Sequence, residues 1–487
     1  MKRIFLIPLA AAPLVAGCAG LAKVRAPDVA APAAYEAPRP DAKGLAPAAL
    51  DSWWTLYDDA QLQDLIARAF ADSPDARDAL AKLRQAAAIR EQSRAQIFLP
   101  SGNPSGTATR TYTDVIDQSA GAIPGFTQQG YANSESANFN VSWELDLVGR
   151  RAAQSASANA DFYAAAFTYE ATRTALAANV AQSVFQLRGL ALQLQDSQEA
   201  ARIDDELLHI AQVKVDRGLG AGGDLDQAVA NAESAKAQVE SLTAQIAAAQ
   251  RALLVLVGRG FDPAESVKPD GALGAPPPVP DSVPGELLRR RPDVLLAEQR
   301  LRSAAGTLRL DQLALLPTIK LNPGVTLSAT SGPFGATSAA WSIGANLTAP
   351  ILDRPRLMGQ LHAQRAVAEQ AVIAYEKAVQ TAYSDAETAF IYLDSDGRRV
   401  ALLTTAEARA RSAYEKSRIG YARGLNDLQT ALVAETTWRN IRSQLSSARS
   451  TLLQRSVQVF KALGGGWTPE APAAGTSYAA LSARGVK

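Results

Sequence analysis

The chain of 487 residues is long enough for about three domains of ordinary size, or for one very elongated unit. Its 49 basic and 48 acidic side chains leave a net charge of +1, which excludes a broad electrostatic case for nucleic acid or for an anionic membrane surface. A single cysteine excludes a disulfide framework and a cysteine-rich metal site, and two histidines make a histidine-ligated metal a poor starting hypothesis.

A secretion signal is expected at the N-terminus. After a basic start, Ile4 to Val15 is apolar but too short to cross a bilayer as a helix. Because Cys18 is the only cysteine and directly follows two small residues, residues 1–17 are interpreted as a lipoprotein signal peptide and Cys18 as the acylated first residue of the mature chain. The alternative is an ordinary signal peptide with an incidental cysteine. Residues 18–50, rich in Ala and Pro, are expected to form an extended strap that buries no core.

Very long helices are expected in two stretches without internal proline, from Pro124 to Pro263 and from Pro355 to Pro469. Both are rich in Ala, Leu, Gln, Glu and Arg, which favour helix. The run from Arg150 to Asp216 would form a rod of ~100 Å at ~1.5 Å per residue, far longer than an ordinary globular helix. Such a rod is typical of a fibre or a tube.

The chain also contains two similar halves. When the sequence is shifted by 206 residues against itself, Arg217-Gly218-Leu219 falls on Arg423-Gly424-Leu425, and Tyr169-Glu170 falls on Tyr375-Glu376. Each half is predicted to contain a helix, two extended segments, a very long helix, a tight Arg-Gly-Leu turn and a returning helix. The shared order of these elements is stronger evidence for a repeat than the scattered identities.

The extended segments alternate apolar and polar residues. The clearest runs from Ala137 to Leu147, with apolar residues at odd positions and polar residues at even ones. Ile319 to Ser328 and Ala339 to Ala349 follow the same rule, and Thr107 to Val115, dominated by threonine, is the weakest of the four. Period two over about ten residues fits strands that cross an outer membrane, with one face toward lipid and one toward a lumen. A soluble half-buried sheet is the alternative.

Four strands cannot close a barrel by themselves, because the smallest bacterial barrels have about eight strands. An open edge in hydrocarbon would leave backbone groups without hydrogen-bond partners. The barrel must therefore be shared between chains. Two chains would give eight strands and three would give twelve, and the strands alone do not decide between them.

Four short segments then point to a known family. They are Trp53-Trp54 with Asp59, Leu62 and Leu65-Ile66; Ser142 to Arg150; Arg291-Pro292-Asp293-Val294 with Ala297-Glu298, Leu301 and Leu316-Pro317; and Lys461 to Trp467. In this order they resemble the outer-membrane efflux proteins of the TolC/NodT type, the OprM-like lipoproteins of tripartite RND-type pumps. The resemblance implies a homotrimer whose shared twelve-stranded outer-membrane β-barrel continues into a long periplasmic α-helical barrel. It also implies three contacts, with a periplasmic adaptor (a membrane fusion protein), an inner-membrane RND-type pump and outer-membrane lipid.

The domain organisation follows from the repeat and the resemblance. We expect a signal peptide at 1–17, a strap at 18–50, a first repeat at 51–262, a Pro-rich equatorial linker at 263–285, a second repeat at 286–466 and a flexible tail at 467–487.

The two Arg-Gly-Leu turns are the strongest candidates for a functional site. An exposed leucine beside an arginine at the tip of a long rod has no core to enter, although the turns also serve as helix caps. The resemblance implies that these tips bind the adaptor and that acidic residues near them form a periplasmic gate. The tip residues are Arg217, Gly218, Leu219, Arg423, Gly424 and Leu425, and the gate candidates are Asp224 and Asp427, since Thr430 stands where a match to Asp224 is expected.

The other motifs give no sign of catalysis. Gly218 to Gly223 matches the dinucleotide pattern G-x-G-x-x-G, but a long helix rather than a strand is expected before it. His209 and His362 fall within expected helices, where solvated or interhelical histidines are commoner than ligands. We therefore expect no enzyme activity, no cofactor and no metal.

The function predicted from the sequence is passive conduction of small molecules or drugs from a periplasmic pump assembly to the exterior. One alternative is an exit duct for type I protein secretion with the same architecture. Another is a periplasm-spanning structural lipoprotein that tethers partners and conducts nothing.

Overall fold

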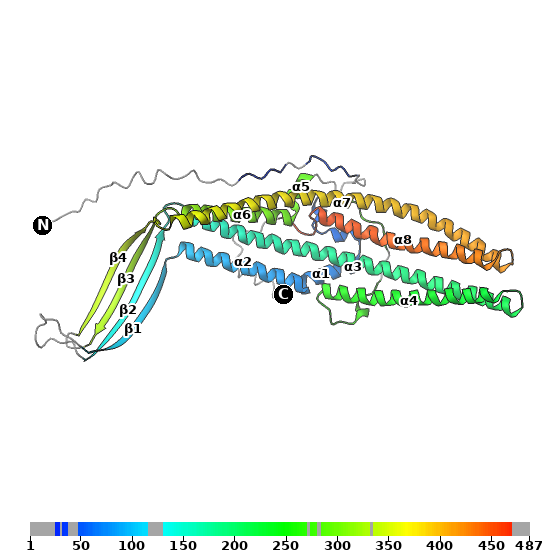
Figure 1. Ribbon diagram of the computed structural model, residues 1–487, viewed down its shortest axis with the longest axis horizontal. Helices are drawn as coiled ribbons and strands as arrows, with labels where there is room; N and C mark the ends of the chain where they lie inside the picture. The colour runs from blue at the N-terminus through cyan, green and yellow to red at the C-terminus, as the bar shows by residue number, and fades with distance from the viewer. Residues whose placement is uncertain are drawn as a thin grey trace, which may run out of the picture.

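The protein is described by a computed structural model that covers residues 25–29, 32–37, 47–114, 130–269, 273–279, 284–331 and 335–469. The signal peptide and Cys18 lie outside the described residues, as does most of the C-terminal tail. Four strands stand at one end of an elongated body of helices, and two helical hairpins reach out at the other end (Figure 1).

The two halves of the chain repeat the same elements. The first half contains α1 (Ala60–Asp72), α2 (Pro74–Phe98), β1 (Ser101–Thr113), β2 (Gly130–Leu145), α3 (Arg150–Asp216) and α4 (Gly222–Leu256). The second contains α5 (Pro284–Arg290), α6 (Pro292–Leu313), β3 (Thr318–Thr330), β4 (Ala336–Thr348), α7 (Arg354–Ala422) and α8 (Leu428–Ala462). The expected mainly helical fold with four strands per chain is confirmed, as is the rod from Arg150 to Asp216.

The paired long helices have nearly equal lengths. α3 has 67 residues and α7 has 69, and each of the returning helices α4 and α8 has 35. α2 and α6 both begin with proline, whose ring suits the first helical turn and has no N–H to leave unpaired there. None of the described helices is both long and apolar enough to cross a bilayer.

The strands form one antiparallel sheet in the order β1-β2-β3-β4. The limits of two expected strands are wrong. β1 begins at Ser101 rather than Thr107, because Gly102, Pro104 and Gly106 are residues that strands ordinarily avoid and they hide its start. β2 runs over Gly130–Leu145, so it starts well before Ala137 and ends before Leu147.

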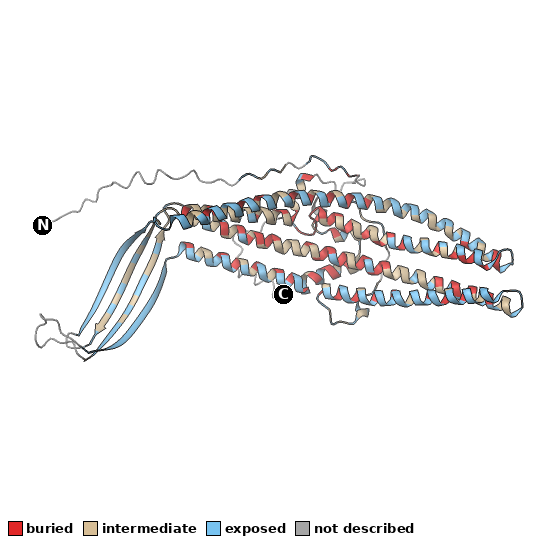
Figure 2. Cartoon of the chain, in the orientation of Figure 1, coloured by how far each residue is buried: buried red, intermediate tan, exposed pale blue. Residues whose placement is uncertain are grey.

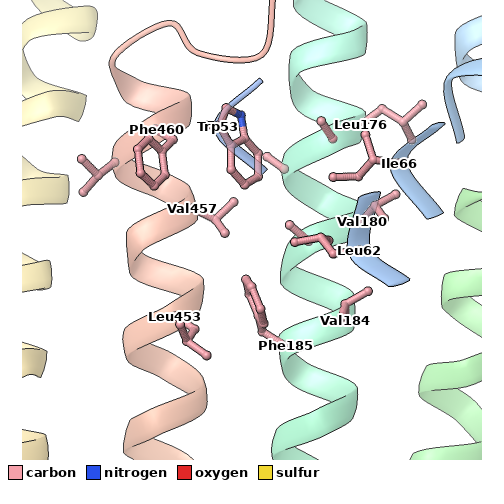
Figure 3. Close-up of a cluster of buried hydrophobic side chains, with 14 of the residues drawn as sticks. Trp53, Leu62, Ile66, Leu176, Val180, Val184, Phe185, Leu453, Val457 and Phe460 are labelled. Carbon is pink, nitrogen blue, oxygen red and sulfur yellow. The ribbon is translucent and has the colours of Figure 1, made fainter. Parts of the chain in front are cut away.

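The core lies midway along the helical body, where buried residues are densest (Figure 2). Trp53 is fully buried and stacks on Phe460 of α8, with ring centroids 5.6 Å apart. Side chains of α3 close the cluster from the other side, among them Val180 and Phe185 (Figure 3). The family-like segment Trp53-Trp54 is therefore a packing element that joins the two halves.

The strap is more firmly held than its composition indicates. Tyr35 is 7% exposed and lies against Tyr383 and Phe390 of α7, so the expectation that this segment buries no core is wrong at this residue. The backbone N–H groups of Glu36 and Ala37 both donate to the carboxylate of Glu387, at 2.6 and 2.9 Å. A carboxylate that accepts two backbone N–H groups holds extended chain without needing a strand.

Candidate functional site: the sheet faces and the helical tips

One face of the sheet is apolar and exposed. Cross-strand register places Phe139, Val325 and Trp341 in one row, and Leu145, Ile319 and Leu347 in another. Trp341 exposes 80% of its surface and Leu347 67%. The alternation predicted from the sequence is thus confirmed across β2, β3 and β4. An apolar face of this size has no protein partner within the described chain, so it requires lipid or another subunit.

At the end of the sheet away from the helices, the apolar face ends in aromatic residues. Tyr112 and Tyr131 lie side by side there, with ring centroids 4.9 Å apart. The guanidinium of Arg110 lies over the Tyr131 ring, 4.3 Å from its centroid. Aromatic residues that border an apolar band are typical of the interface between a membrane and water.

The opposite face of the sheet carries hydroxyl and amide groups. The hydroxyl groups of Ser328 and Ser338 are hydrogen-bonded across β3 and β4 at 2.8 Å. Those of Thr107 and Ser136 are hydrogen-bonded across β1 and β2 at 2.7 Å. The charged residues on this face of the described strands are Glu144 and Lys320, which are partners in the register at the end nearest the helices. This face can line a water-filled passage, because its groups make hydrogen bonds without presenting a large charge.

A tight turn joins the sheet to the first long helix. The Asp146 carboxylate accepts hydrogen bonds from the backbone N–H groups of Gly149, Arg150 and Arg151, at 2.8 to 3.0 Å. Gly149 has φ 84°, a left-handed backbone that glycine adopts easily. These contacts hold the direction of α3 relative to β2.

The two Arg-Gly-Leu turns have the same geometry. Gly218 has φ 68° and Gly424 has φ 73°. The N–H of Leu219 donates to the carbonyl of Lys214, and the N–H of Leu425 donates to that of Gly420, both at 2.8 Å. This is the Schellman pattern of a helix C-terminus, in which glycine supplies the left-handed residue.

The leucines of these turns do not pack. A Schellman turn is often accompanied by an apolar contact of the residue after the glycine with the last turn of the helix. Here Leu219 and Leu425 each remain 76% exposed at the tips of the hairpins. Arg217 and Arg423 are exposed beside them. The six predicted tip residues thus form two similar exposed patches, each with one apolar and one cationic side chain.

The two gate candidates occupy unlike positions. Asp427 caps α8, since its carboxylate accepts a hydrogen bond from the Thr430 N–H at 2.8 Å. Hydrogen bonding to Thr430 lowers the pKa of Asp427. Asp224 lies in the first turn of α4. Burial raises the pKa of Tyr421 in α7, and the charge of Asp224 adds to this effect.

Polar contacts between the two hairpins were not foreseen from the sequence. Four residues along α3 each bond to the second hairpin: Asp196 to Arg442 at 2.7 Å, Asp204 to Arg439 at 3.1 Å, Glu206 to Arg418 at 2.9 Å, and Lys214 to the Tyr421 carbonyl at 3.2 Å. We call this set the hairpin joint. Its partners lie more than 200 residues apart, so no local pattern could have revealed them.

Several other conspicuous residues have structural roles. Arg291 binds Asp293 and Asp385, at 2.6 and 2.9 Å, and so ties the start of α6 to α7. Asp59 pairs with the buried Arg188 of α3. Asp293 and Asp59 belong to segments that carry the family resemblance, so part of that resemblance reflects assembly of the core.

The remaining chemical candidates stay apart. His209 and His362 are exposed on different helices, and the described residues contain no cluster of three or more metal-ligating side chains. The glycine-rich stretch from Gly218 to Gly223 follows α3 and forms the hairpin turn, as expected. Within the described chain, the geometry offers two sheet faces and two tips rather than a catalytic centre.

Comparison with known proteins agrees with this geometry. The family model described as outer membrane efflux protein matches residues 65–259 and 283–465. The chain is 27% identical over 420 residues to the pyoverdine export outer membrane protein OpmQ of Pseudomonas aeruginosa, covering 85% of this chain and 87% of that one. It is likewise 27% identical to the toluene efflux pump outer membrane protein TtgF of Pseudomonas putida and 26% identical to the cation efflux system protein CusC of Escherichia coli K12, each covering 85% of this chain.

Solved structures show the same fold. The outer-membrane channel OprN superposes with a TM-score of 0.78 at 27% identity, over 91% of this chain and all of that one. The open state of the Neisseria gonorrhoeae MtrE outer membrane channel gives a TM-score of 0.78 at 22% identity, over 93% of this chain and all of that one.

Proposed function

The chain belongs to the outer membrane efflux protein family, and from this premise we propose that it is the lipid-anchored exit duct of a tripartite pump, docked through its helical tips. It is the outer-membrane channel of an efflux system and not an enzyme. The observation that carries the proposal is an exposed apolar sheet face at one end of a helical body ~100 Å long.

The channel is a homotrimer in which three four-stranded sheets close a barrel of twelve strands. Within one chain, β1 and β4 each leave one edge without a partner strand. Joining β1 of one copy to β4 of the next removes every open edge, which is what backbone in hydrocarbon requires. The long helices of the three copies continue the wall as an α-helical barrel.

The solutes are proposed to be small molecules or drugs. The names of relatives refer to pyoverdine, toluene and cations, so the family itself does not specify one solute class. These names support efflux over protein secretion. The exposed apolar sheet supports a membrane channel over a tether, because a tether confined to the periplasm would have no use for it.

The tips are proposed to bind a periplasmic adaptor that connects the channel to an inner-membrane RND-type pump. The exposure of Leu219 and Leu425 supports this assignment, since each is an apolar anchor with no partner in the described chain. Asp224 and Asp427 remain proposed gate residues. Asp224 is the better of the two, because its carboxylate does not cap a helix as that of Asp427 does.

The anchor is proposed to be an acyl chain on Cys18, which places the mature N-terminus at the inner leaflet of the outer membrane. The docking of the strap on α7 supports the proposal, because it leads the chain from the membrane end toward the core. Intact mass spectrometry of the mature protein is expected to give an acylated chain that begins at Cys18. An unmodified N-terminus elsewhere would contradict the anchor but not the channel.

The test of the function combines conductance with export. The purified trimer is expected to give discrete conductance steps in a planar bilayer. The gene, expressed with its own adaptor and pump in an efflux-deficient host, is expected to restore resistance to small toxic compounds. A protein that inserts but neither conducts nor restores export would be a tether, and one that exports only a protein substrate would be a secretion duct.

A further inference from the structure

Two buried carboxyl groups share a single cation of the hairpin joint, Arg439. Asp204 of α3 is 2% exposed and Glu435 of α8 is 1% exposed. The guanidinium of Arg439 bonds to Asp204 Oδ2 at 3.1 Å and lies 3.8 Å from Glu435 Oε1. Two carboxylates and one guanidinium have a net charge of −1. A buried charge that is not balanced is costly, so this cluster needs one further positive charge.

Three polar atoms of the cluster have no hydrogen-bond partner among the described residues. They are Asp204 Oδ1, Glu435 Oε1 and the Tyr414 hydroxyl. Tyr414 of α7 is 4% exposed, and its ring stacks on Trp438 at 5.2 Å. Burial raises the pKa of Tyr414; the charge of Arg418 opposes this effect, and the charges of Glu435, Glu206 and Asp204 add to it. Buried oxygen atoms without a hydrogen-bond partner are costly, so this cluster favours a further hydrogen-bond donor.

We propose that Asp204 and Glu435 form a proton-binding site within the hairpin joint, which holds one proton between them in the resting channel and weakens the joint when the proton leaves. The proton supplies the missing positive charge. It also turns one carboxylate into an O–H donor that can reach an unpaired oxygen beside it. The site lies between α3 and α8 rather than in the tip turns themselves, so the proposal goes beyond the transport function and does not depend on the solute.

The titration of the two carboxyl groups agrees with this arrangement. Burial, and then the charge of Asp204, raise the pKa of Glu435 to about 7, against the opposing effect of Arg439. Burial also raises the pKa of Asp204, although Arg439 opposes it. A proton held near pH 7 makes the site responsive over the range to which a periplasmic joint is exposed.

The other charged groups around the cluster are already paired. On α3, Asp205 bonds to Lys236 of α4 at 3.3 Å and Glu206 bonds to Arg418 of α7 at 2.9 Å. Glu407 of α7 accepts from the Trp438 indole at 2.8 Å, and Arg442 of α8 bonds to Asp196 at 2.7 Å. Thus none of these groups is free to replace the proton.

A small cavity lies next to Arg439. It has a volume of about 40 Å³ and is lined by Trp438, Arg439 and Arg442 of α8 together with Asp196 of α3 and other residues. The side chain of Arg439, which bonds to Asp204, is about one-third exposed, so the cluster borders water on this side.

The sign of the effect on stability follows from the raised pKa of Glu435. Between the ordinary carboxyl pKa of 4.5 and about 7, the folded joint holds a proton that the unfolded chain has lost. The contribution of Glu435 to the free energy of unfolding is therefore fully present below the ordinary pKa. It falls as the pH rises from the ordinary pKa to the raised one, and it changes little at higher pH. Local opening of α8 is expected to become easier at alkaline pH.

The experiment compares the wild-type trimer with Glu435→Gln, which keeps the shape of a protonated carboxyl group. Hydrogen exchange of residues 428–440, corrected for the intrinsic effect of pH, is expected to speed up on the order of a hundredfold between pH 5 and pH 8 in the wild type. The Gln variant is expected to change only a few-fold. Glu240→Gln, at an exposed position of α4, is the matched control and is expected to behave as wild type.

Difference infrared spectroscopy gives a second readout that does not depend on stability. A protonated buried carboxyl band is expected at pH 6, and it should disappear at pH 8 and be missing in Glu435→Gln. If that variant does not assemble, Asp204→Asn is used instead, and the band should then titrate at lower pH because the charge of Asp204 is gone. A band that is absent from the wild type, or unchanged in both variants, overturns the proposal. Exchange that follows sodium concentration at constant pH also overturns it, since the ligand would then be a metal cation.

Discussion

Gly218 and Gly424 lie 206 residues apart in the chain, yet they adopt the same left-handed backbone, with φ 68° and 73°. Each ends a helix of nearly 70 residues and turns the chain back into a helix of 35. The identical turns are the most direct sign that the two halves of the protein repeat one unit. They also bring Leu219 and Leu425 to the tips in the same exposed position.

Replacing these glycines should damage the turns. Gly218→Val and Gly424→Val force a β-branched residue into a left-handed backbone, which costs about 1–3 kcal/mol at each site. We expect lower trimer yield and faster proteolysis at the tips. Gly223→Val is the matched control, because Gly223 lies inside α4 with ordinary φ and open space around its Cβ position. Equal damage in all three variants would argue against a special role for the turn.

Charges at the tip leucines should separate assembly from export. Leu219→Asp with Leu425→Asp leaves the helices and the sheet intact, so the trimer level should stay normal. Docking should fail, because burying an unpaired carboxylate in an apolar contact is costly. Drug susceptibility and adaptor cross-linking are the measurements, with Leu→Met at both sites as the conservative control. If the Asp variants export and cross-link normally, the adaptor binds elsewhere on the helical barrel.

The two faces of the sheet should respond differently to arginine. Val141→Arg and Ile343→Arg place a charge on the apolar face, at a cost of about 2–4 kcal/mol near the middle of the bilayer. Asn140→Arg and Asn346→Arg place the same charge on the polar face and should be better tolerated. Heat stability of the detergent-solubilised trimer is the measurement. A similar loss on both faces would mean that the faces have been assigned wrongly.

The packing of α3 against α8 at Ser450 depends on Gly189. A Cβ added there would lie 2.5 Å from Ser450 Oγ, so Gly189→Ala should destabilise the chain by about 1–3 kcal/mol through overpacking. Gly189→Ala with Ser450→Gly should recover part of that loss, because the second change removes the clashing atoms. Gly397→Ala, in α7 with nothing near the added Cβ, should instead stabilise by roughly 1 kcal/mol. Thermal unfolding of the trimer distinguishes these outcomes.

The sequence was most informative where one element determines its own conformation. The length of α3 follows from the absence of proline, the turns follow from glycine, and the sheet faces follow from alternation. It was least informative where contacts join helices distant in sequence. In the sequence, Asp204 and Glu435 resemble residues of an exposed helix surface, although both are buried. An Ala-rich helix that packs on several sides has no single apolar stripe to reveal which of its positions are buried. The start of β1 was missed for a different reason, since its glycines and proline disguise a strand.

Substitutions can distinguish whether Asp427 acts only as a helix cap or also as a gate residue. Its carboxylate accepts the Thr430 N–H at the start of α8, a bond that asparagine can also accept. Asp427→Asn should therefore preserve the cap and remove only the charge, whereas Asp427→Ala should also lose the cap, at a cost of about 1 kcal/mol. If Asp427 is only a cap, the Asn variant should conduct as wild type and the Ala variant should be less stable.

A gate charge would give the opposite result, because removing it weakens the field at the periplasmic opening whether or not the helix is capped. Both Asp427 variants should then change the ion selectivity of the purified channel in a planar bilayer. Asp224→Asn is the comparison, since Asp224 serves no such cap. We expect Asp224→Asn to alter selectivity and Asp427→Asn to leave it unchanged, because the hydrogen bonds that lower the pKa of Asp427 also hold its carboxylate against the helix end and away from a passing ion. Altered selectivity in Asp427→Asn alone would reverse this assignment.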